Sequence, residues 1–143
     1  MLVHDPRWYP CSGNVDAVMF ARFQSAEPTA SGRHPGVFAL ANGLAADGFL
    51  TPEEHSWWRE NNAWFELAHA DPGRAHPEIF DRATNAYTAC WFKVGSADHL
   101  IERLDGYLRL LDKYGISWER LMSDDPGRIL YEDDFQVVVD ISG

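Results

Sequence analysis

The residues with the clearest chemical potential lie on one predicted helix. At 100° per residue, Glu54, Trp58, Asn61 and Trp64 fall within one arc of the helix surface, together with further aromatic side chains. A carboxylate or an amide in an apolar face must find hydrogen-bond partners, and loss of hydration raises the pKa of a carboxylate. The pattern predicts an aromatic ligand-binding pocket beside a helix over 52–70.

In such a pocket Glu54 is the first candidate acid or base, and Trp58 is an apolar wall. A structural interpretation of the same residues stays open. An acid in the first turn stabilises the helix dipole, and a buried amide such as that of Asn61 can bond to a backbone group. Because both interpretations remain, no catalytic residue is assigned from the sequence.

A second group of residues offers ligand types that divalent metals use, namely His69, Asp71 and His76. Their spacing lacks the helical geometry of an HExxH motif, and the prolines at 72 and 77 favour a loop that directs the side chains apart. We therefore expect solvent-exposed histidines here and no metal site.

Motifs for other cofactors and for nucleophilic catalysis are absent from the sequence. The glycines form neither GxGxxG nor GxxxxGK[ST], and the chain contains no CxxC pair and no GxSxG elbow. We expect no cofactor. Both cysteines are expected to be reduced, with Cys90 a small core residue of a strand and Cys11 the more exposed of the two.

Acidic residues gather on both sides of a short predicted strand. Asp124 and Asp125 precede it, and a trio formed by Glu132, Asp133 and Asp134 follows it. A strand of about five residues separates the two groups by about 15 Å, which is too far for one metal site but compatible with a broad acidic face. The trio is therefore a candidate partner-binding surface, although Asp residues also stabilise turns through their side chains.

The charge of the chain restricts its partners. Twenty-two acidic residues against twelve basic ones give a net charge of −10, which opposes approach to a phosphate backbone. We expect no direct nucleic-acid binding, whereas a basic protein partner is compatible with this charge. The basic residues are arginines except for Lys93 and Lys113, a composition that indicates a GC-rich bacterial genome.

The elements that must position these residues follow from periodicity and turn signals. Strands are predicted at 15–24 and 87–94, an extended segment at 116–122, and a C-terminal hairpin from 128–131 and 135–141. Helices are predicted at 37–46, at 52–70 behind the Thr51-Pro52 start signal, and at 96–115, with one further helical turn around 78–83.

The helix over 96–115 has the most regular pattern. Ser96 is its expected N-cap, and its apolar residues form one continuous stripe. The stripe consists of Leu100, Ile101, Leu104, Tyr107, Leu108 and Leu111. We expect this stripe to be buried.

Strands that frame helices, rather than alternating strictly with them, indicate an α+β fold. We expect one domain over 1–143, with a predominantly antiparallel sheet of about four or five strands packed by three main helices. No run reaches the roughly 18 apolar residues of a membrane span, and the start MLVHDPRWYP lacks the order of a signal peptide. These features predict a cytoplasmic protein that does not enter the membrane.

Size, charge and motif content together favour a small acidic interaction protein, either a regulator or an inhibitor or immunity-type partner of a more basic macromolecule. The alternative is a small-molecule-binding protein or small enzyme that uses the aromatic pocket beside the helix over 52–70. A third possibility, a structural subunit of an assembly, predicts a large exposed aromatic patch instead. The oligomeric state stays open.

Overall fold

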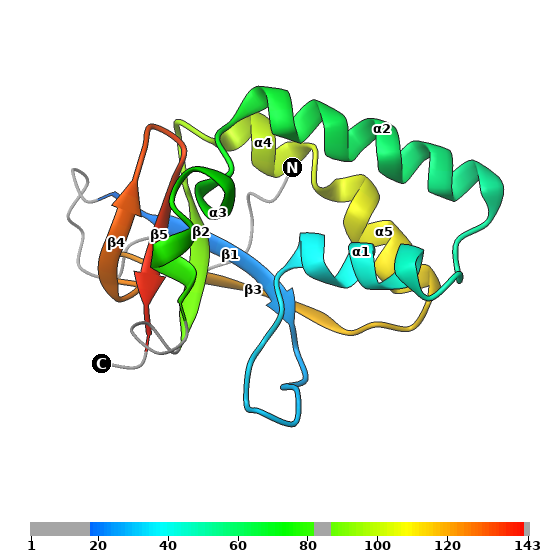
Figure 1. The fold of residues 1–143 in the computed structure, drawn as a ribbon, viewed down its shortest axis with the longest axis horizontal. Helices are drawn as coiled ribbons and strands as arrows, with labels where there is room; N and C mark the ends of the chain where they lie inside the picture. The colour runs from blue at the N-terminus through cyan, green and yellow to red at the C-terminus, as the bar shows by residue number, and fades with distance from the viewer. Residues whose placement is uncertain (1–17, 82–86, 142–143) are drawn as a thin grey trace. The chain divides into compact units, whose positions relative to one another are not determined.

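The fold is described by a computed structural model in which residues 18–81 and 87–141 are placed (Figure 1). Five strands form one sheet. They are β1 (Phe20–Ser25), β2 (Thr88–Lys93), β3 (Trp118–Ser123), β4 (Arg128–Glu132) and β5 (Gln136–Asp140). The helices are α1 (Val37–Ala46), α2 (Pro52–Ala68), α3 (Pro72–Ala75), the 3₁₀ helix η2 (Pro77–Phe80), α4 (Asp98–Glu102) and α5 (Asp105–Lys113).

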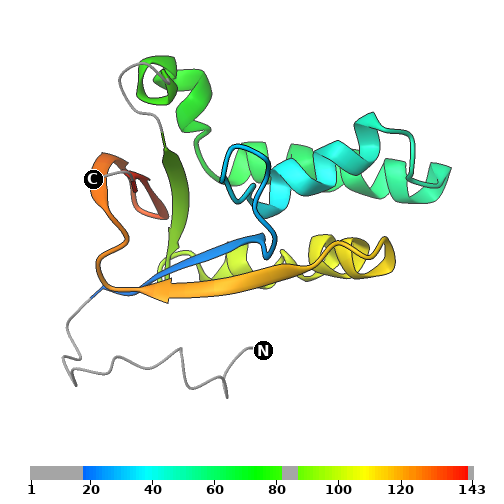
Figure 2. The same cartoon turned by 90° about the horizontal axis from the view of Figure 1, so that it is seen from below.

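The strands lie in the order β3-β1-β2-β5-β4, and their pairing is antiparallel. Cys90 of β2 is opposite Val138 of β5. The strands β4 and β5 form the predicted C-terminal hairpin, seen side by side in Figure 2, with a register shift between Ile129 and Tyr131. The predicted α+β fold with an antiparallel sheet is confirmed.

The chain divides into two compact units, each built from separated segments. The first unit comprises the described residues within Met1–Arg22, Pro72–Glu102 and Arg120–Gly143. The second comprises Phe23–Asp71 and Arg103–Glu119. The strands β1 and β3 contribute residues to both units. The single domain over 1–143 stays a prediction.

In the first unit the core forms on the sheet. The run from Val137 to Val139 in β5 is fully buried, as expected for a continuous apolar strand covered on both faces. One buried cluster joins three strands, with partly buried Leu121 packed against it. Its buried members are Phe20, Ala89, Trp91, Val137 and Val139.

The expectation that Cys90 is a core residue is wrong. Its side chain is exposed, while its neighbours Ala89 and Trp91 are buried. Successive side chains of a strand point to opposite faces, so only one of two adjacent residues can share the buried face. Cys11 lies outside the described residues.

The helix predicted over 96–115 is interrupted. It forms α4 and α5, and the break falls at Arg103 and Leu104, where the chain passes from the first unit to the second. The expected N-cap is also wrong, because Ser96 donates its hydroxyl to the carbonyl of Asp134 at 2.6 Å and α4 begins at Asp98. The predicted apolar stripe is nevertheless buried along its whole length.

The other predicted elements agree with the structure except at their ends. The strand predicted from 15 begins at Phe20, and its first three predicted residues lie outside the described part. The helix over 52–70 ends at Ala68. The helical turn expected around 78–83 corresponds to η2.

In the described ranges, no helix has the length and apolar character needed to cross a membrane.

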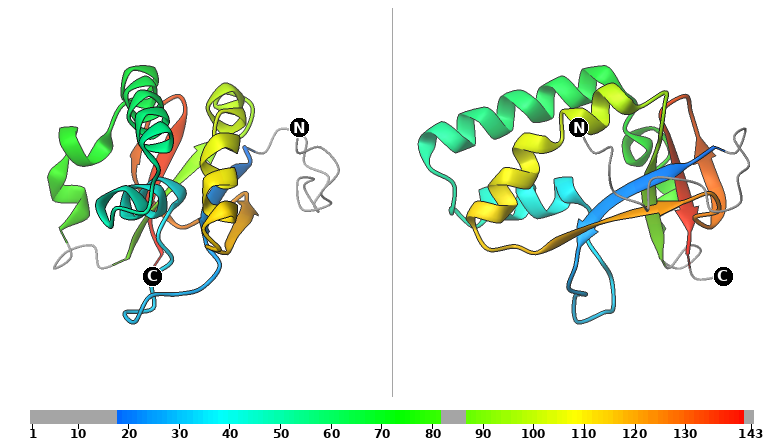
Figure 3. Two further views of the ribbon diagram at one scale, coloured as in Figure 1. Left: turned by 90° about the vertical axis from the view of Figure 1, so that its right-hand side faces the viewer. Right: turned by 180° about the vertical axis from the view of Figure 1, so that it is seen from behind.

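In the second unit α1, α2 and α5 pack around Tyr107, and they lie next to one another in both views of Figure 3. The Tyr107 side chain is fully buried. The rings of Phe38, Trp57 and Phe65 meet it edge-on, with centroids 5.3, 4.9 and 5.8 Å away. Its hydroxyl donates to Asn62 Oδ1 at 2.6 Å, so the buried polar group is satisfied.

The buried stripe leads to a stability prediction. Leu104 is 0% exposed, so we expect Leu104→Ala to lower the free energy of unfolding by about 2–5 kcal/mol in urea titrations. Leu67, which is 92% exposed on α2, provides the matched control, and Leu67→Ala should change stability by less than about 0.5 kcal/mol. Equal effects of the two substitutions would contradict the burial of the stripe.

Candidate functional site

The start of α2 fixes the position of Glu54. Thr51 is the N-cap, and its hydroxyl oxygen accepts from the backbone N–H of Glu54 at 3.2 Å. The Glu54 carboxylate accepts in return from the backbone N–H of Thr51 at 2.9 Å. This capping box, followed by Pro52 in the first turn, is the local reason why the helix begins here.

The Glu54 carboxylate also joins α2 to the end of α5. Lys113 Nζ donates to Oε2 at 2.6 Å, and the Tyr114 hydroxyl donates to Oε1. The hydrogen bond from Lys113, followed by those from Tyr114 and Thr51, lowers the pKa of Glu54 to about 2. The same contacts with Glu54 raise the pKa of Lys113 and of Tyr114.

This result reverses the pKa shift expected for Glu54 as an acid or base. A desolvated carboxylate near neutrality has a raised pKa, whereas here the hydrogen-bond donors stabilise the anion more than burial opposes it. Glu54 therefore stays ionised at neutral pH and holds two helices together.

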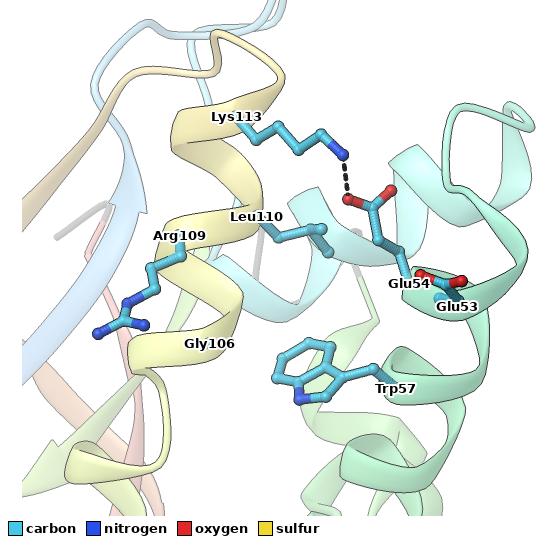
Figure 4. Close-up of a pocket in the computed structure, with 7 residues that line it drawn as sticks. All are labelled: Glu53, Glu54, Trp57, Gly106, Arg109, Leu110 and Lys113. Atoms are coloured by element: carbon cyan, nitrogen blue, oxygen red, sulfur yellow. Dashed lines mark hydrogen bonds and ion pairs between the residues drawn. The ribbon is translucent and has the colours of Figure 1, made fainter.

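An open cleft of about 320 Å³ lies beside Glu54, between α2 and α5 (Figure 4). It is lined by Glu53, Glu54, Trp57, Gly106, Arg109, Leu110 and Lys113. Figure 4 shows the indole of Trp57 reaching from α2 toward α5, with Leu110 and the Glu54–Lys113 ion pair further along the cleft. All seven residues belong to the second unit.

The indole of Trp57 occupies space that Gly106 leaves open. A Cβ atom on Gly106 would lie 2.2 Å from Cζ2 of Trp57, which is closer than real contacts allow. A glycine at this position of α5 is therefore required for the indole to lie against the helix backbone and to form one wall of the cleft.

Of the four residues predicted for the pocket, only Glu54 lines the cleft. Trp58 instead donates its indole N–H to Asn42 of α1 at 2.9 Å. Asn61 is buried and donates to the carbonyl of Trp57 at 2.8 Å, as its structural interpretation predicted. Trp64 lies under the guanidinium of Arg103, which is 4.0 Å from the ring centroid.

Helix geometry explains why Trp57 and not Trp58 lines the cleft. Positions three and four residues after Glu54 flank it on opposite sides of the helix surface. Trp57 lies on the side of α5 and Trp58 on the side of α1. Sequence periodicity identifies the apolar face of α2, but it does not show which helix packs against each side of that face.

Apart from Glu54, none of the seven residues that line the cleft was predicted as a pocket residue, and Asn62 was missed as well. Asn62 accepts from the Tyr107 hydroxyl and donates to Asn42 Oδ1 at 3.1 Å, which links three helices. Gly106 lies next to Tyr107 in the apolar stripe of α5, and a glycine inside a helix can allow another side chain to approach the helix backbone closely. This was the sequence signal for the contact between Trp57 and α5.

The charges along the cleft are mostly paired. Lys113 is bound to Glu54, and the guanidinium of Arg109 lies 2.9 Å from the carboxylate of Asp105 one turn earlier. Glu53 is exposed, and its carboxylate forms no ion pair or hydrogen bond with any residue that the structure describes. The unpaired charge of the cleft is therefore negative.

The three acids of the hairpin have different surroundings. Glu132 is paired with Lys93. Asp133 accepts from the backbone N–H of Phe135 and Gln136, at 2.9 and 3.0 Å, and from the hydroxyl of Tyr131. Burial acts to raise the pKa of Asp133, but these hydrogen bonds outweigh it and lower the pKa.

Asp134 is the remaining acid of the trio. Its side chain is exposed, while its backbone carbonyl accepts from Ser96. Asp124 and Asp125 are also exposed. The hairpin turn is thus built by Asp133, and Asp134 presents its charge to solvent.

The histidines considered as metal ligands are engaged in local contacts. His69 is half-buried rather than solvent-exposed, with Nδ1 2.9 Å from the carbonyl of Ala70 and its ring near Phe65. His76 is exposed and lies 3.5 Å from a carboxylate oxygen of Glu78. In the part of the chain that the structure covers, no group of three or more His, Cys, Asp or Glu residues could hold a metal ion.

Neither a protein-family model, nor a curated protein, nor a solved structure matches this chain.

The ion pair at the end of the cleft makes stability depend on pH. Because the pKa of Glu54 falls from 4.5 to about 2 on folding, its stabilising contribution is present above about pH 5 and is lost as the pH falls toward 2. We expect Glu54→Gln to lower the melting temperature at pH 7, and the difference from the parent chain to shrink between pH 5 and pH 2. Glu53→Gln is the control, and a pH-independent difference for Glu54→Gln would contradict the pKa shift.

The contact between Gly106 and Trp57 predicts an unusual sign for a glycine substitution. Alanine normally stabilises a helix relative to glycine by about 0.5–1 kcal/mol, and we expect this gain for Gly43→Ala in α1, where a Cβ would meet nothing within 4 Å. Gly106→Ala should instead destabilise the chain by about 1–3 kcal/mol, because Trp57 must move. Urea titration of both variants measures the change in the free energy of unfolding. Stabilisation by both substitutions would contradict the close contact between Gly106 and Trp57.

Proposed function

We propose that the chain is a small acidic interaction protein that binds a more basic macromolecule, as a regulator or as an inhibitor or immunity-type partner. The proposal rests on the surplus of acid in both units. Among the described residues, each unit contains ten acidic and five basic side chains. Even if every base paired with one acid, half of the acids in each unit would keep a charge that no base of that unit neutralises.

Several of the basic residues are already paired with acids. Lys93, Arg109, Lys113 and Arg128 each bind an acid within their own unit. Acids such as Glu53 and Asp134 then present charge to solvent. A surface of this kind steers a basic partner by long-range attraction and repels nucleic acid.

The second candidate function is binding of a small molecule beside α2. It is supported by the cleft on the α2–α5 side, whose volume is at the lower end of the range for ligand sites. The lowered pKa of Glu54 removes the support for Glu54 as an acid or base at neutral pH, so what the cleft supports is the binding part of this candidate.

Retention of basic proteins tests the proposal. The immobilised chain should retain a basic protein from a native lysate at low salt and release it as salt is added, because exposed charges are screened. Failure to retain any basic protein, or retention that is independent of salt, would contradict the proposal. Binding to duplex DNA at physiological salt would contradict the argument from charge.

The captured partner then allows a test of the hairpin acids Glu132, Asp133 and Asp134 as a partner surface. We expect Asp134→Asn to slow association more than it accelerates dissociation, since a peripheral charge acts mainly on encounter. Asp47→Asn removes the same charge from an exposed position in the second unit and is the matched control. Equal association rates for both variants would assign the effect to net charge and exclude the hairpin as a specific surface.

A further inference from the structure

We propose that the α2–α5 cleft binds a cationic side chain, an arginine or a lysine, of the basic protein partner. The inference rests on the proposed function and gives that function a binding site. In this arrangement the apolar stem of the side chain lies on Trp57 and Leu110, and its cation lies beside Glu53.

The apolar part of the cleft suits the stem of a long basic side chain. Trp57 supplies an indole that lies against the α5 backbone at Gly106, and Leu110 supplies an aliphatic side chain. Arginine and lysine bury their methylene groups along such surfaces while the charged end stays in water. An indole also attracts cations through its electron-rich face.

The charges of the cleft favour a cation over an anion. Arg109 and Lys113 are neutralised by acids, and Figure 4 shows the guanidinium of Arg109 directed away from the indole of Trp57. The carboxylate of Glu53 remains without a partner among the residues that are placed in the structure. An incoming cation can pair with Glu53 without disturbing an existing ion pair, whereas an anion would have to compete with Asp105 for Arg109 or with Glu54 for Lys113.

The size of the cleft limits the occupant to a single anchoring group. A volume of about 320 Å³ accepts one side chain or a small molecule of similar size. Interfaces between proteins commonly depend on a few side chains that fill such pockets, and arginine and tryptophan are enriched among them. Rigid walls reduce the ordering cost of binding, and here both the capping box and the Glu54–Lys113 ion pair hold the walls in place.

The experiment uses the full chain and follows the indole N–H signals by NMR. N-acetyl-arginine amide, a Gly-Arg-Gly-Arg-Gly peptide, N-acetyl-norleucine amide and N-acetyl-glutamate amide are titrated in turn. The Trp57 signal is identified by its loss in Trp57→Phe. Calorimetric titration of the parent chain gives the affinities independently of that assignment.

We expect both arginine probes to shift the Trp57 signal, with the peptide binding more tightly than the free amino-acid derivative. Glu53→Gln should weaken their binding roughly two- to fivefold, the range for an exposed ion pair. Glu60→Gln is the matched control, because it removes the same charge from an exposed position on α2 outside the cleft, and it should leave the affinity unchanged.

Several outcomes would overturn the inference. Equal binding of norleucine and arginine would show an apolar occupant, and stronger binding of the glutamate probe would show an anionic one. Equal losses in Glu53→Gln and Glu60→Gln would show a response to net charge alone. Tighter binding of the free arginine derivative than of the peptide would show a small-molecule site.

The inference can fail separately from the proposed function. If the captured basic protein binds Glu53→Gln and the parent chain equally, the cleft is not its anchor while the interaction function stands. If no basic protein is captured and only the free derivative binds, the proposed function fails and the cleft is a site for a small cation.

Discussion

The burial of Tyr107 is the constraint on which the second unit depends. A fully buried phenol must be hydrogen-bonded, and Asn62 on α2 satisfies its hydroxyl. Burial also raises the pKa of Tyr107, so the hydroxyl stays protonated and able to donate. Three aromatic rings, from Phe38, Trp57 and Phe65, meet the same ring edge-on and thereby set the positions of α1 and α2 against α5.

The cleft follows from this packing. Because Tyr107 fixes α5 against α2, the adjacent Gly106 lies directly under the indole of Trp57, and the indole forms one wall. Glu54 closes the far end by binding Lys113. Most residues that line the cleft therefore have structural partners of their own, and Glu53 is the charged lining residue left for a ligand. The capping box and the Glu54–Lys113 ion pair hold the walls of the cleft in place, which reduces the ordering cost of binding a single group.

The sequence predicted the elements with local signals and missed what depends on distant partners. The capping box at Thr51 and the valine run of β5 identify their elements directly. The raised pKa that the pocket interpretation requires of Glu54 is not found, because its strongest partner, Lys113, lies 59 residues away in the sequence and lowers it. The break between α4 and α5 falls at Arg103 and Leu104, and neither residue is a proline or a glycine. The sequence therefore contains no local signal for this break. Such features arise from packing and become visible only in the folded chain.

The fold also decides which acids can serve recognition. Glu54, Asp133 and Asp140 accept several hydrogen bonds or a guanidinium, and these contacts fix helices, a turn and a strand pair. Acids used in this way contribute to the overall field but cannot reorient toward a partner. With a surplus of acid in both units, attraction of a basic partner is a property of the whole surface, whereas specificity must come from places where an unpaired acid adjoins apolar surface. Glu53 beside Trp57 meets that condition, because its carboxylate has no partner in the described chain and the indole next to it is held in place.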